Sequence, residues 1–478
     1  MTLSSAPADP TAPNNNSGHA VNGLPNVNAL RRPVARGETR GEAWRRQQLK
    51  AMRQLLDQHE GEILEALHTD LGKPPTEGMV EVLALRQELK LCDRMLRRWM
   101  RPRKVPVPLP LQPGQAEVIR EPLGCVLIIG PWNYPFHLTL QPLISALAAG
   151  NSAVIKPSEH APATAGLIER CLGDAFSPDV VKVVQGDGRT AAALVDQGYD
   201  HIFFTGGGSI GSKVLAGAAH HLTPVTLELG GKSPAVVLRG ADLTVTARRL
   251  IWGKGLNAGQ TCIAPDYLLV EKDLRTPLLE ALKTARVELY GNNPLHSDDL
   301  GHIINPRQYQ RLEGLLEGAK AQGQVLIGGE CDPSNLRIAP TVLGVDQPDD
   351  PLMDDELFGP LLPLIDVDDL ATAMEQIRSQ PKPLALYLFG GNTAQQQQLL
   401  MGTSSGGVCF NDVVMHVGIP DLPFGGVGPS GMGSYHGEAG FRTFSHERSV
   451  LRRPFALDLR LRYPPYRISL DWMKRLLG

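Results

Sequence analysis

The chain has 478 residues, which at roughly 100 to 200 residues per domain allows two or three domains with an ample buried core. Hydrophobic residues make up 42% and charged residues 20%, and 47 basic against 50 acidic side chains give a net charge of −3. This balance excludes a disordered chain, a collagen and a protein that coats nucleic acid. The six cysteines are scattered and form no C-x-x-C pair, so we expect no disulfide framework, no metal site and a reducing, cytoplasmic location.

The first 36 residues are rich in Ser, Pro, Ala and Asn and lack the apolar run of about 7 to 15 residues that an export signal needs. We expect a disordered tail over residues 1–36. The most apolar region, residues 124–155, is interrupted by Pro131, Pro135 and Pro142 and falls short of the ~20 continuous residues of a membrane span. The sequence therefore predicts no segment that crosses a bilayer.

Residues 37–100 place apolar side chains at helical spacing, as at Ile63, Leu67 and Leu71, and predict two or three amphipathic helices. Residues 101–122 then alternate prolines with valines and leucines around a Pro113-Gly114 turn. Because proline cannot donate to a central ladder, this segment predicts an edge hairpin that pairs with another chain or domain.

From residue 124 onward, short apolar runs alternate with helical stretches. This alternation is typical of βαβ units, in which a parallel sheet is covered on both faces. The predicted strands of a first α/β region are residues 125–129, 152–155, 180–184, 201–204 and 225–229. A second α/β region, residues 233–411, includes predicted strands at 235–238, 267–270, 324–327 and 385–389.

A G-x-G-x-x-G pattern, Gly206, Gly208 and Gly211, follows the predicted strand 201–204. Such a turn lets the backbone approach a pyrophosphate at a helix N-terminus, although a plain structural turn explains the pattern as well. Glu228, 17 residues beyond Gly211, is near the spacing of a ribose ligand. Its place at an apolar strand end instead suits a general base, because burial raises a carboxyl pKa.

Lys156 and Glu159 follow the predicted strand 152–155, where ligands of a parallel sheet gather, and are better ribose candidates. Cys262 lies in a small, polar run that could expose a thiol, whereas a lone cysteine is more commonly a small buried hydrophobe. A nucleophilic thiol needs a base and donors to the developing oxyanion, and Glu228 and Asn133 could supply these.

Seven segments together resemble the signature motifs of the aldehyde dehydrogenase superfamily, in the same order and over about residues 40 to 465. They are PWNYP at 131–135, KPSE at 156–159, residues 204–211, 227–234 and 259–262, ELFGP at 356–360 and PFGG at 423–426. Four runs resemble the class 3 branch, the dimeric enzymes for fatty and aromatic aldehydes. These are LTPVTLELGG at 222–231, GQTCIAPDY at 259–267, SGMGSYHG at 430–437 and RYPP at 462–465.

The resemblance implies a role for each matching residue. Cys262 would be the nucleophile, Asn133 with the Cys262 backbone N–H would form the oxyanion hole, and Glu228 would activate the hydrolytic water. The implied cofactor-binding residues are Trp132, Lys156, Glu159, Gly206, Gly207, Ser209, Gly211, Glu356 and Phe358, of which Glu356 and Phe358 would hold the nicotinamide ribose and ring. Tyr134, Trp252 and Phe424 match pocket positions and would line an apolar funnel, with core packing as the alternative.

The resemblance also implies an aldehyde dehydrogenase fold: a Rossmann-like, parallel-sheet cofactor domain, an α/β catalytic domain and a small β arm for oligomerisation. The expected parts are a NAD(P)-binding domain (37–102 and 121–229), a catalytic domain (230–425), an arm with C-terminal strands (103–120 and 426–465) and an amphipathic helix (466–478). We expect a homodimer without nucleic acid. Residues 447–478 hold eight basic and three acidic side chains, so the last helix could rest on anionic lipid or be an ordinary solvated helix.

The implied activity is NAD(P)-dependent, hydrolytic oxidation of lipophilic aldehydes, whether medium- or long-chain aliphatic, aromatic or apocarotenoid. Two alternatives are an acylating enzyme that transfers the product to coenzyme A and a non-catalytic structural relative. Glu228 argues against the first, and the presence of Cys262, Glu228, Asn133, Lys156 and Glu356 argues against the second. Glu159 favours NAD because a carboxylate accepts from a ribose 2′-hydroxyl, but class 3 enzymes often accept both NAD and NADP.

Overall fold

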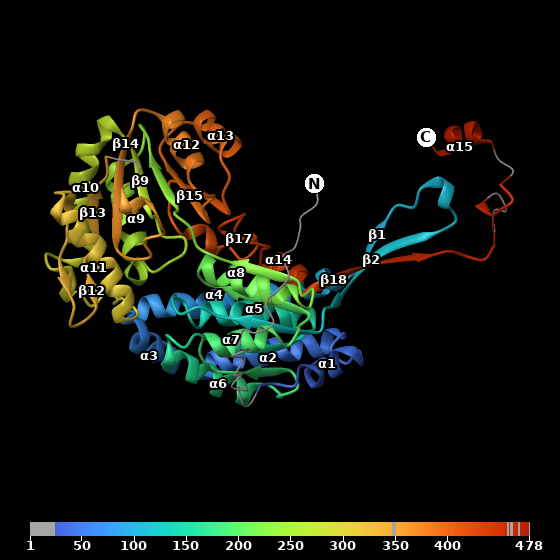
Figure 1. Cartoon of the computed structure of the whole chain (residues 1–478). Coiled ribbons are helices and arrows are strands. Elements are labelled where there is room, and N and C mark those ends of the chain that lie inside the picture. The colour runs from blue at the N-terminus through green and yellow to red at the C-terminus, as the bar shows by residue number, and fades with distance from the viewer. Residues whose placement is uncertain (1–23, 347–349, 457, 459–461, 467–468, 478) are drawn as a thin grey trace, which may run out of the picture.

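The computed structural model describes residues 24–346, 350–456, 458, 462–466 and 469–477. It has two α/β lobes and an arm that extends away from them (Figure 1). Four helices precede the first lobe's sheet: α1 (Val27–Ala35), α2 (Glu42–Gln58), α3 (Glu60–Leu71) and α4 (Pro75–Met100). Helix α1 packs on two strands of this sheet, whereas α2, α3 and α4 pack on helices of the same lobe. The predicted amphipathic helices of residues 37–100 are thus α2, α3 and α4.

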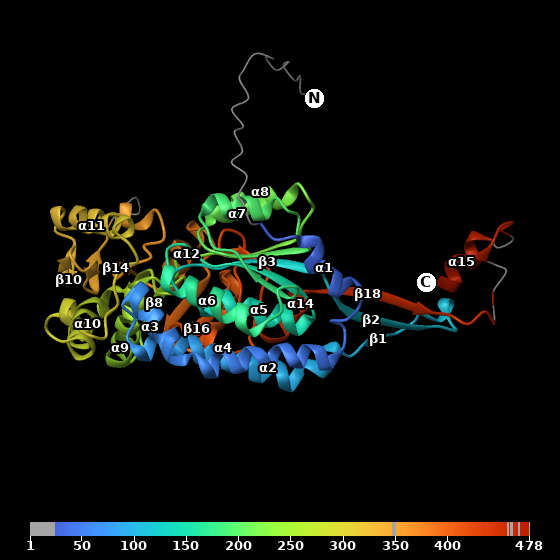
Figure 2. The same cartoon turned by 90° about the horizontal axis from the view of Figure 1, so that it is seen from below.

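The sheet of the first lobe has the strand order β17-β7-β6-β3-β4-β5, and all its strands are parallel except β17. The strands are β3 (Cys125–Ile129), β4 (Ser152–Lys156), β5 (Val181–Val183), β6 (His201–Thr205), β7 (Val225–Glu228) and β17 (Gly431–Met432), and the helices between them are α5 (His137–Ala149), α6 (Pro162–Ala175), α7 (Gly188–Val195) and α8 (Gly208–Ala219). Val126 and Ile128 of β3 belong to one core cluster and Cys125, Leu127 and Ile129 to another. Because helices cover both faces (Figure 2), the strands consist of continuous apolar runs.

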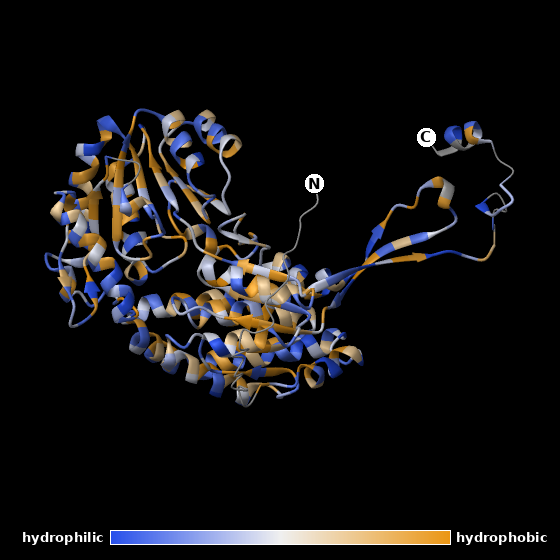
Figure 3. Cartoon of the chain, viewed as in Figure 1, coloured by the Kyte–Doolittle hydropathy of each residue, from blue (hydrophilic) through white to orange (hydrophobic). Residues whose placement is uncertain are grey.

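The second lobe holds a sheet of order β10-β13-β14-β9-β8-β15-β16, in which β10 alone is antiparallel. Its strands are β8 (Pro234–Val237), β9 (Tyr267–Glu271), β10 (Val325–Ile327), β13 (Thr341–Gly344), β14 (Leu361–Val367), β15 (Ala385–Phe389) and β16 (Gly407–Phe410). Its helices are α9 (Leu243–Gly255), α10 (Arg275–Tyr290), α11 (Pro306–Ala321), α12 (Leu370–Ser379) and α13 (Thr393–Gly402), and a two-stranded ladder joins β11 (Cys331–Asp332) to β12 (Arg337–Ile338). Figure 3 shows the sheet strands as mainly hydrophobic and the outer helices as mixed. The predicted α/β architecture is confirmed.

The arm is an antiparallel sheet in which β2 (Gln115–Pro122) lies between β1 (Arg103–Val105) and β18 (Ser445–Arg452). The predicted hairpin of residues 101–122 is therefore present, and a C-terminal strand completes it. Leu109 in the short 3-10 turn between β1 and β2 is 85% exposed, and Leu451 and Phe455 are exposed as well. The arm thus carries apolar side chains without a partner among the described residues of the chain.

Two of the expected boundaries were wrong. Residues 27–35 form α1 instead of a disordered tail, because Val27, Leu30 and Val34 are buried and Asn26 caps the helix; residues 1–23 lie outside the described part. Residues 426–465 do not all belong to the arm, since β17 extends the first sheet and α14 (Gly437–Thr443) packs on α4 and α5.

At the C-terminal end, α15 (Leu470–Leu477) forms inside the helix expected at 466–478, with Leu470 and Trp472 exposed. Residues 467, 468 and 478 of that expected helix lie outside the described part. Within the described residues, no helix combines the length and the apolar composition needed to cross a membrane.

Candidate active site

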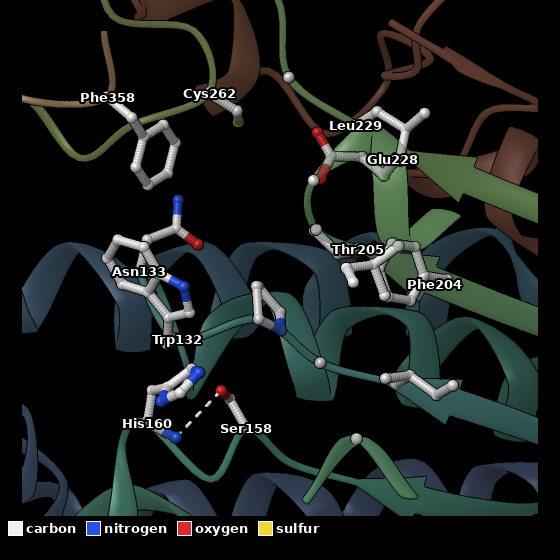
Figure 4. Close-up of a pocket in the computed structure, with 18 of the residues that line it drawn as sticks. Trp132, Asn133, Ser158, His160, Phe204, Thr205, Glu228, Leu229, Cys262 and Phe358 are labelled. Atoms are coloured by element: carbon white, nitrogen blue, oxygen red, sulfur yellow. Dashed lines mark hydrogen bonds between the residues drawn. The ribbon is translucent and has the colours of Figure 1, made fainter. Parts of the chain in front are cut away.

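A cavity of about 530 Å³ lies where the carboxyl ends of the first sheet face the second lobe. The first lobe contributes the strand ends of β3, β4, β6 and β7, and the second lobe contributes the loops that hold Cys262, Glu356 and Phe358. Figure 4 shows how the side chains surround this space. Ligands of parallel α/β sheets bind at such an edge.

The turn between β6 and α8 leaves room for a ligand beside the backbone. A Cβ atom on Gly207 or Gly208 would meet nothing within 4 Å, and Gly207 lines the cavity next to the N-terminus of α8. A Cβ on Gly206 would instead lie 2.6 Å from the Phe204 ring, and one on Gly211 would lie 2.9 Å from Leu229. Gly206 and Gly207 border the cavity, as the expected phosphate turn requires, whereas Gly211 does not; Gly206 and Gly211 also leave room for the side chains of Phe204 and Leu229.

Ser209, which was expected to contact the cofactor, is exposed on α8 and is not part of the cavity lining. The sequence pattern fixed the position of the turn but not the direction of each side chain. This helix-start serine lies two residues past Gly207, the last glycine of the turn that borders the cavity.

Lys156 and Glu159 lie at the end of β4 and form an ion pair at the cavity wall. Lys156 is 3% exposed, while Glu159 is about a third exposed. Burial raises the pKa of Glu159, but the hydrogen bond and charge of Lys156, a backbone hydrogen bond and the charge of His160 together bring the pKa below its usual value. Glu159 is therefore an ionised acceptor, which suits the hydroxyls of a ribose.

Cys262 is the one cysteine among the described residues that lines the cavity, and its side chain is partly exposed. The loop before Cys262 has left-handed backbone conformation, which most residues rarely adopt: the φ angles of Asn257, Ala258 and Gly259 are 52°, 53° and 74°. Gln260 fixes this turn: its side chain donates to His302 O at 2.9 Å and accepts from Ile304 N at 2.9 Å. Strained backbone of this kind persists only where its surroundings determine it, and it is common at functional sites.

The Cys262 thiol and the Glu228 carboxyl influence each other's protonation. Burial first, and then the charge of Glu228, raises the pKa of the thiol well above its usual value. Burial likewise raises the pKa of Glu228, which is 2% exposed, to about 8, and one of its carboxyl oxygens has no hydrogen-bond partner among the described residues. At neutral pH both groups are therefore mainly in their neutral forms.

Asn133 follows β3, is 5% exposed and borders the same part of the cavity as Cys262 and Glu228 (Figure 4). Two donors fix its backbone carbonyl, Lys73 Nζ at 2.8 Å and Asn257 Nδ2 at 2.8 Å. No described residue forms a hydrogen bond with its carboxamide, which leaves the amide N–H free to donate to a ligand. This is what an oxyanion donor requires.

Glu356 and Phe358 line the cavity from the second lobe. The Phe358 ring meets the Trp132 ring edge to face at 5.2 Å, and Phe358 has a φ of 47°, so its backbone is held in a strained position. Burial raises the pKa of Glu356 well above its usual value. Gly230 makes room for this carboxyl, since a Cβ there would lie 2.7 Å from Glu356 Cδ.

The three residues expected to form the aldehyde funnel do not line this cavity. Tyr134 donates to or accepts from Thr261 Oγ1 at 2.8 Å, Trp252 packs against the main core and Phe424 is 6% exposed among aromatic rings. The alternative of core packing describes Phe424 and Trp252 in this structure. Their part in an aldehyde path stays a prediction.

Two buried charged groups that support the site were not predicted from the sequence. Lys73 forms an ion pair with Glu81 at 2.5 Å below the Asn133 loop. Asp266 binds Lys232 at 2.8 Å and accepts from Leu357 N at 3.1 Å, between Glu356 and Phe358. Lys73 and Lys232 both lie in loops, and nothing in a loop sequence shows that a lysine is buried against a carboxylate.

The fold and the site define a class: a two-lobed enzyme in which a thiol, a carboxyl and an amide meet beside a cavity suited to a dinucleotide. A model of the aldehyde dehydrogenase family matches residues 38–450, and the chain belongs to this family.

Known relatives agree in sequence and in structure. Aldehyde dehydrogenase family 3 member H1 of Arabidopsis thaliana is 47% identical over 455 residues, which are 94% of each chain. The 4,4'-diaponeurosporen-aldehyde dehydrogenase of Staphylococcus aureus is 40% identical over 91% of this chain and 95% of its own. The substrate-bound structure of Staphylococcus aureus AldH superposes with a TM-score of 0.90 at 38% identity and covers 94% of this chain and 98% of the other.

The resemblance to the class 3 branch is thus confirmed, and the chain is an aldehyde dehydrogenase. Members of the family use NAD or NADP, as predicted.

Proposed function

We propose that this enzyme oxidises lipophilic aldehydes to carboxylic acids through a covalent bond to Cys262. The observation that carries the proposal is the meeting of Cys262, Asn133 and Glu228 at one part of the cavity, with Lys156, Glu159 and the glycine turn along its walls. Cys262→Ser tests it: we expect loss of aldehyde-dependent cofactor reduction, and turnover at the parental rate would contradict the proposal.

In the first half-reaction the Cys262 thiol loses its proton to solvent, and Glu228 is left free to act on water in the second half-reaction. The sulfur then bonds to the aldehyde carbon, and the alkoxide formed from the carbonyl oxygen is stabilised by the Asn133 amide and the Cys262 backbone N–H. A dinucleotide held by Lys156, Glu159 and the glycine turn would supply the two-electron acceptor for the hydride that leaves the thiohemiacetal carbon, and Cys262 then carries a thioester. The thiohemiacetal route is supported by the position of Cys262 in the cavity wall, where the Asn133 amide borders the same space.

In the second half-reaction, Glu228 removes a proton from water. The water oxygen bonds to the thioester carbon, the carbon–sulfur bond breaks, and the acid leaves while Cys262 regains its proton. A buried carboxyl with a pKa of about 8 is well matched to this base role near neutral pH. Transfer to coenzyme A is the competing outcome, and equal product formation with and without coenzyme A would support hydrolysis.

Both NAD and NADP are proposed as cofactors, with Lys156 and Glu159 as the ribose ligands. The ionised Glu159 accepts from a 2′-hydroxyl and repels a 2′-phosphate, while Lys156 offsets part of that repulsion. The ratio of kcat/KM with NAD to kcat/KM with NADP measures this preference, and we expect the value with NAD to be higher.

The substrate class rests on the class 3 relatives, one of which is named for an apocarotenoid aldehyde. Medium- and long-chain aliphatic, aromatic and apocarotenoid aldehydes are the proposed substrates. The test is to measure kcat/KM for a series of aldehydes that differ in chain length and ring type. The value should be higher for lipophilic aldehydes than for acetaldehyde, and a preference for acetaldehyde would contradict the proposal.

A homodimer formed through the arm is part of the proposal. β1 and β18 are edge strands that leave backbone groups for another chain, and Leu109, Leu451 and Phe455 expose apolar surface beside them. Sedimentation velocity of the parent and of a Leu109→Glu, Leu451→Glu double variant tests this dimer. We expect the parent to sediment as a dimer and the variant as a monomer, and a monomeric parent would contradict the proposal.

Peripheral membrane contact through α15 is the last part of the proposal, and a cytoplasmic location stays a prediction. The exposed Trp472 and Leu470, together with the basic C-terminal composition, support contact with anionic lipid. Co-sedimentation with anionic liposomes is measured with and without residues 468–478, and equal binding would contradict the contact.

A further inference from the structure

Helix α4 carries three acidic residues along one of its faces: Glu77, Glu81 and Glu88. At about 100° per residue, offsets of 4 and 11 residues place all three within roughly 40° of one another. Glu81 and Glu88 are 0% exposed, and Glu77 is partly buried. None of the three lines the dinucleotide cavity, so the proposed chemistry gives them no task.

Each carboxyl accepts a backbone N–H from a different loop. Glu77 accepts from Asn257 N at 2.9 Å, Glu81 from His137 N at 2.9 Å and Glu88 from Gly437 N at 2.9 Å. The first loop leads to Cys262, and the second contains Asn133. The third loop, at Gly437, holds neither of the two.

Lys73 joins Glu81 to the Asn133 loop at a second point. Its ammonium lies 2.5 Å from Glu81 Oε1 and donates to Asn133 O at 2.8 Å, while it sits 3.8 Å from the centre of the Tyr134 ring. The Lys73–Glu81 pair therefore binds the loop both at Asn133 and at His137. The pair is fully buried, so water does not compete for these bonds.

Asn257 connects the two loops directly. Its backbone N–H is held by Glu77, while its side chain donates to Asn133 O at 2.8 Å and to Gln260 O at 3.1 Å. The carbonyl of Asn133 thus receives one bond from the α4 side, through Lys73, and one from the Cys262 loop. A displacement of either loop breaks a bond to the other.

Such bonds are needed because the backbone they hold is strained. Asn257 and Ala258 have left-handed φ angles of 52° and 53°, a conformation that ordinary residues keep only where the surroundings impose it. Burial also raises the pKa of Glu77 to about 7, so this carboxyl is itself unfavourable in its position. The hydrogen bond that the Glu77 carboxyl accepts from Asn257 N offsets part of the cost of burying this carboxyl.

We propose that Glu77 and the Lys73–Glu81 pair are positioning residues, which hold the Cys262 nucleophile and the Asn133 donor at their working separation. The inference rests on the proposed roles of Cys262 and Asn133. Glu88 is the internal control, because it lies on the same helix face and accepts an equivalent bond from a loop that contains neither residue.

The test compares Glu77→Met, which cannot accept the bond, with Glu77→Gln, whose amide oxygen can. We expect Glu77→Met to lower kcat on the order of 10- to 100-fold with the aldehyde KM changed less than about threefold, since small misplacements of reacting groups have effects of this size. Glu77→Gln should stay within about threefold of the parent. Glu88→Met measures what the loss of one such bond from α4 does to stability alone.

A second readout does not depend on turnover: the rate at which iodoacetamide alkylates Cys262, followed by peptide mapping. Glu77→Met should speed this reaction about tenfold, because a thiol displaced from burial and from the Glu228 charge forms its thiolate more readily, whereas Glu88→Met should not. Asn257→Ala breaks the same connection without touching α4 and should reproduce both effects if Glu77→Met does not fold.

Parental kcat and alkylation rates in Glu77→Met or Asn257→Ala, or equal changes in Glu88→Met, would overturn the inference. Failure of the proposed function gives a different pattern, in which the parent itself does not oxidise aldehydes or Cys262→Ser retains activity.

Discussion

Replacing Glu228 with glutamine removes the carboxyl that lies buried near Cys262 and leaves a side chain of similar size. Burial raises the pKa of Glu228 to about 8, so about a tenth of the carboxyl is ionised at pH 7 and about nine-tenths at pH 9. Because the base form is the ionised form, kcat of the parent should rise about tenfold between these pH values when hydrolysis of the thioester limits turnover.

The Glu228→Gln variant has no such group, so its kcat should lose this rise and fall by about 10²- to 10⁴-fold, the usual contribution of a general base. Formation of the thioester does not need the water-activating step. Rapid mixing with aldehyde and NAD should therefore give a burst of about one reduced cofactor per site before turnover stalls. Glu288→Gln, at an exposed carboxyl of α10, is the matched control. A variant that keeps the parental pH profile, or that shows no burst, would refute the reasoning.

Further outcomes follow from individual contacts. Asn133→Ala should lower kcat about 10²- to 10³-fold in steady-state assays, because an oxyanion donor is lost. Glu159→Gln should raise kcat/KM for NADP relative to NAD, and an unchanged ratio would contradict the ribose assignment. Gly230→Ala should weaken binding of NAD in titration calorimetry, since its Cβ would displace the Glu356 carboxyl. Glu228→Gln should be more thermostable than the parent at pH 9. The folded-state pKa of Glu228 lies above its ordinary value of 4.5, so the neutral form stabilises the fold; the parent loses this stability as pH rises from about 4.5 to about 8, and the difference between the two melting temperatures should grow over that window.

The sheets of both lobes could be predicted because buried parallel strands need apolar side chains on both faces. The strand at 385–389 was predicted at its observed bounds, and the strand at 201–204 lacks only Thr205. The helix α1 was missed because its few apolar residues stand among Pro, Asn and Arg, and only burial against β3 and β4 makes it a helix. Tertiary contacts there decide what local composition does not.

Some residues of the candidate site could likewise be predicted from the sequence, and others could not. Lys156, Glu159, Glu228 and Cys262 could be predicted because each follows or ends a strand or a recognisable motif, and all of them line the cavity. Ser209 could not be placed, since a one-residue difference at a helix start turns a side chain from a ligand to solvent.

The supporting groups were beyond the reach of sequence patterns. Lys73 and Asn133 are 60 residues apart, and Asn257 reaches Asn133 across 124 residues. Each such bond depends on how two loops meet in space. A helical acid such as Glu81 has the sequence signature of a surface residue, because only its partner in the fold reveals that it is buried.

Mass spectrometry of the acyl-enzyme tests the central claim most directly. The Glu228→Gln variant is mixed with a lipophilic aldehyde and NAD, quenched with acid and digested, and the modified peptide is identified. We expect one acyl group per chain on Cys262, in amounts equal to the reduced cofactor formed. Reduced cofactor with no acyl group on Cys262, or an acyl group on another residue, would contradict the role of this thiol.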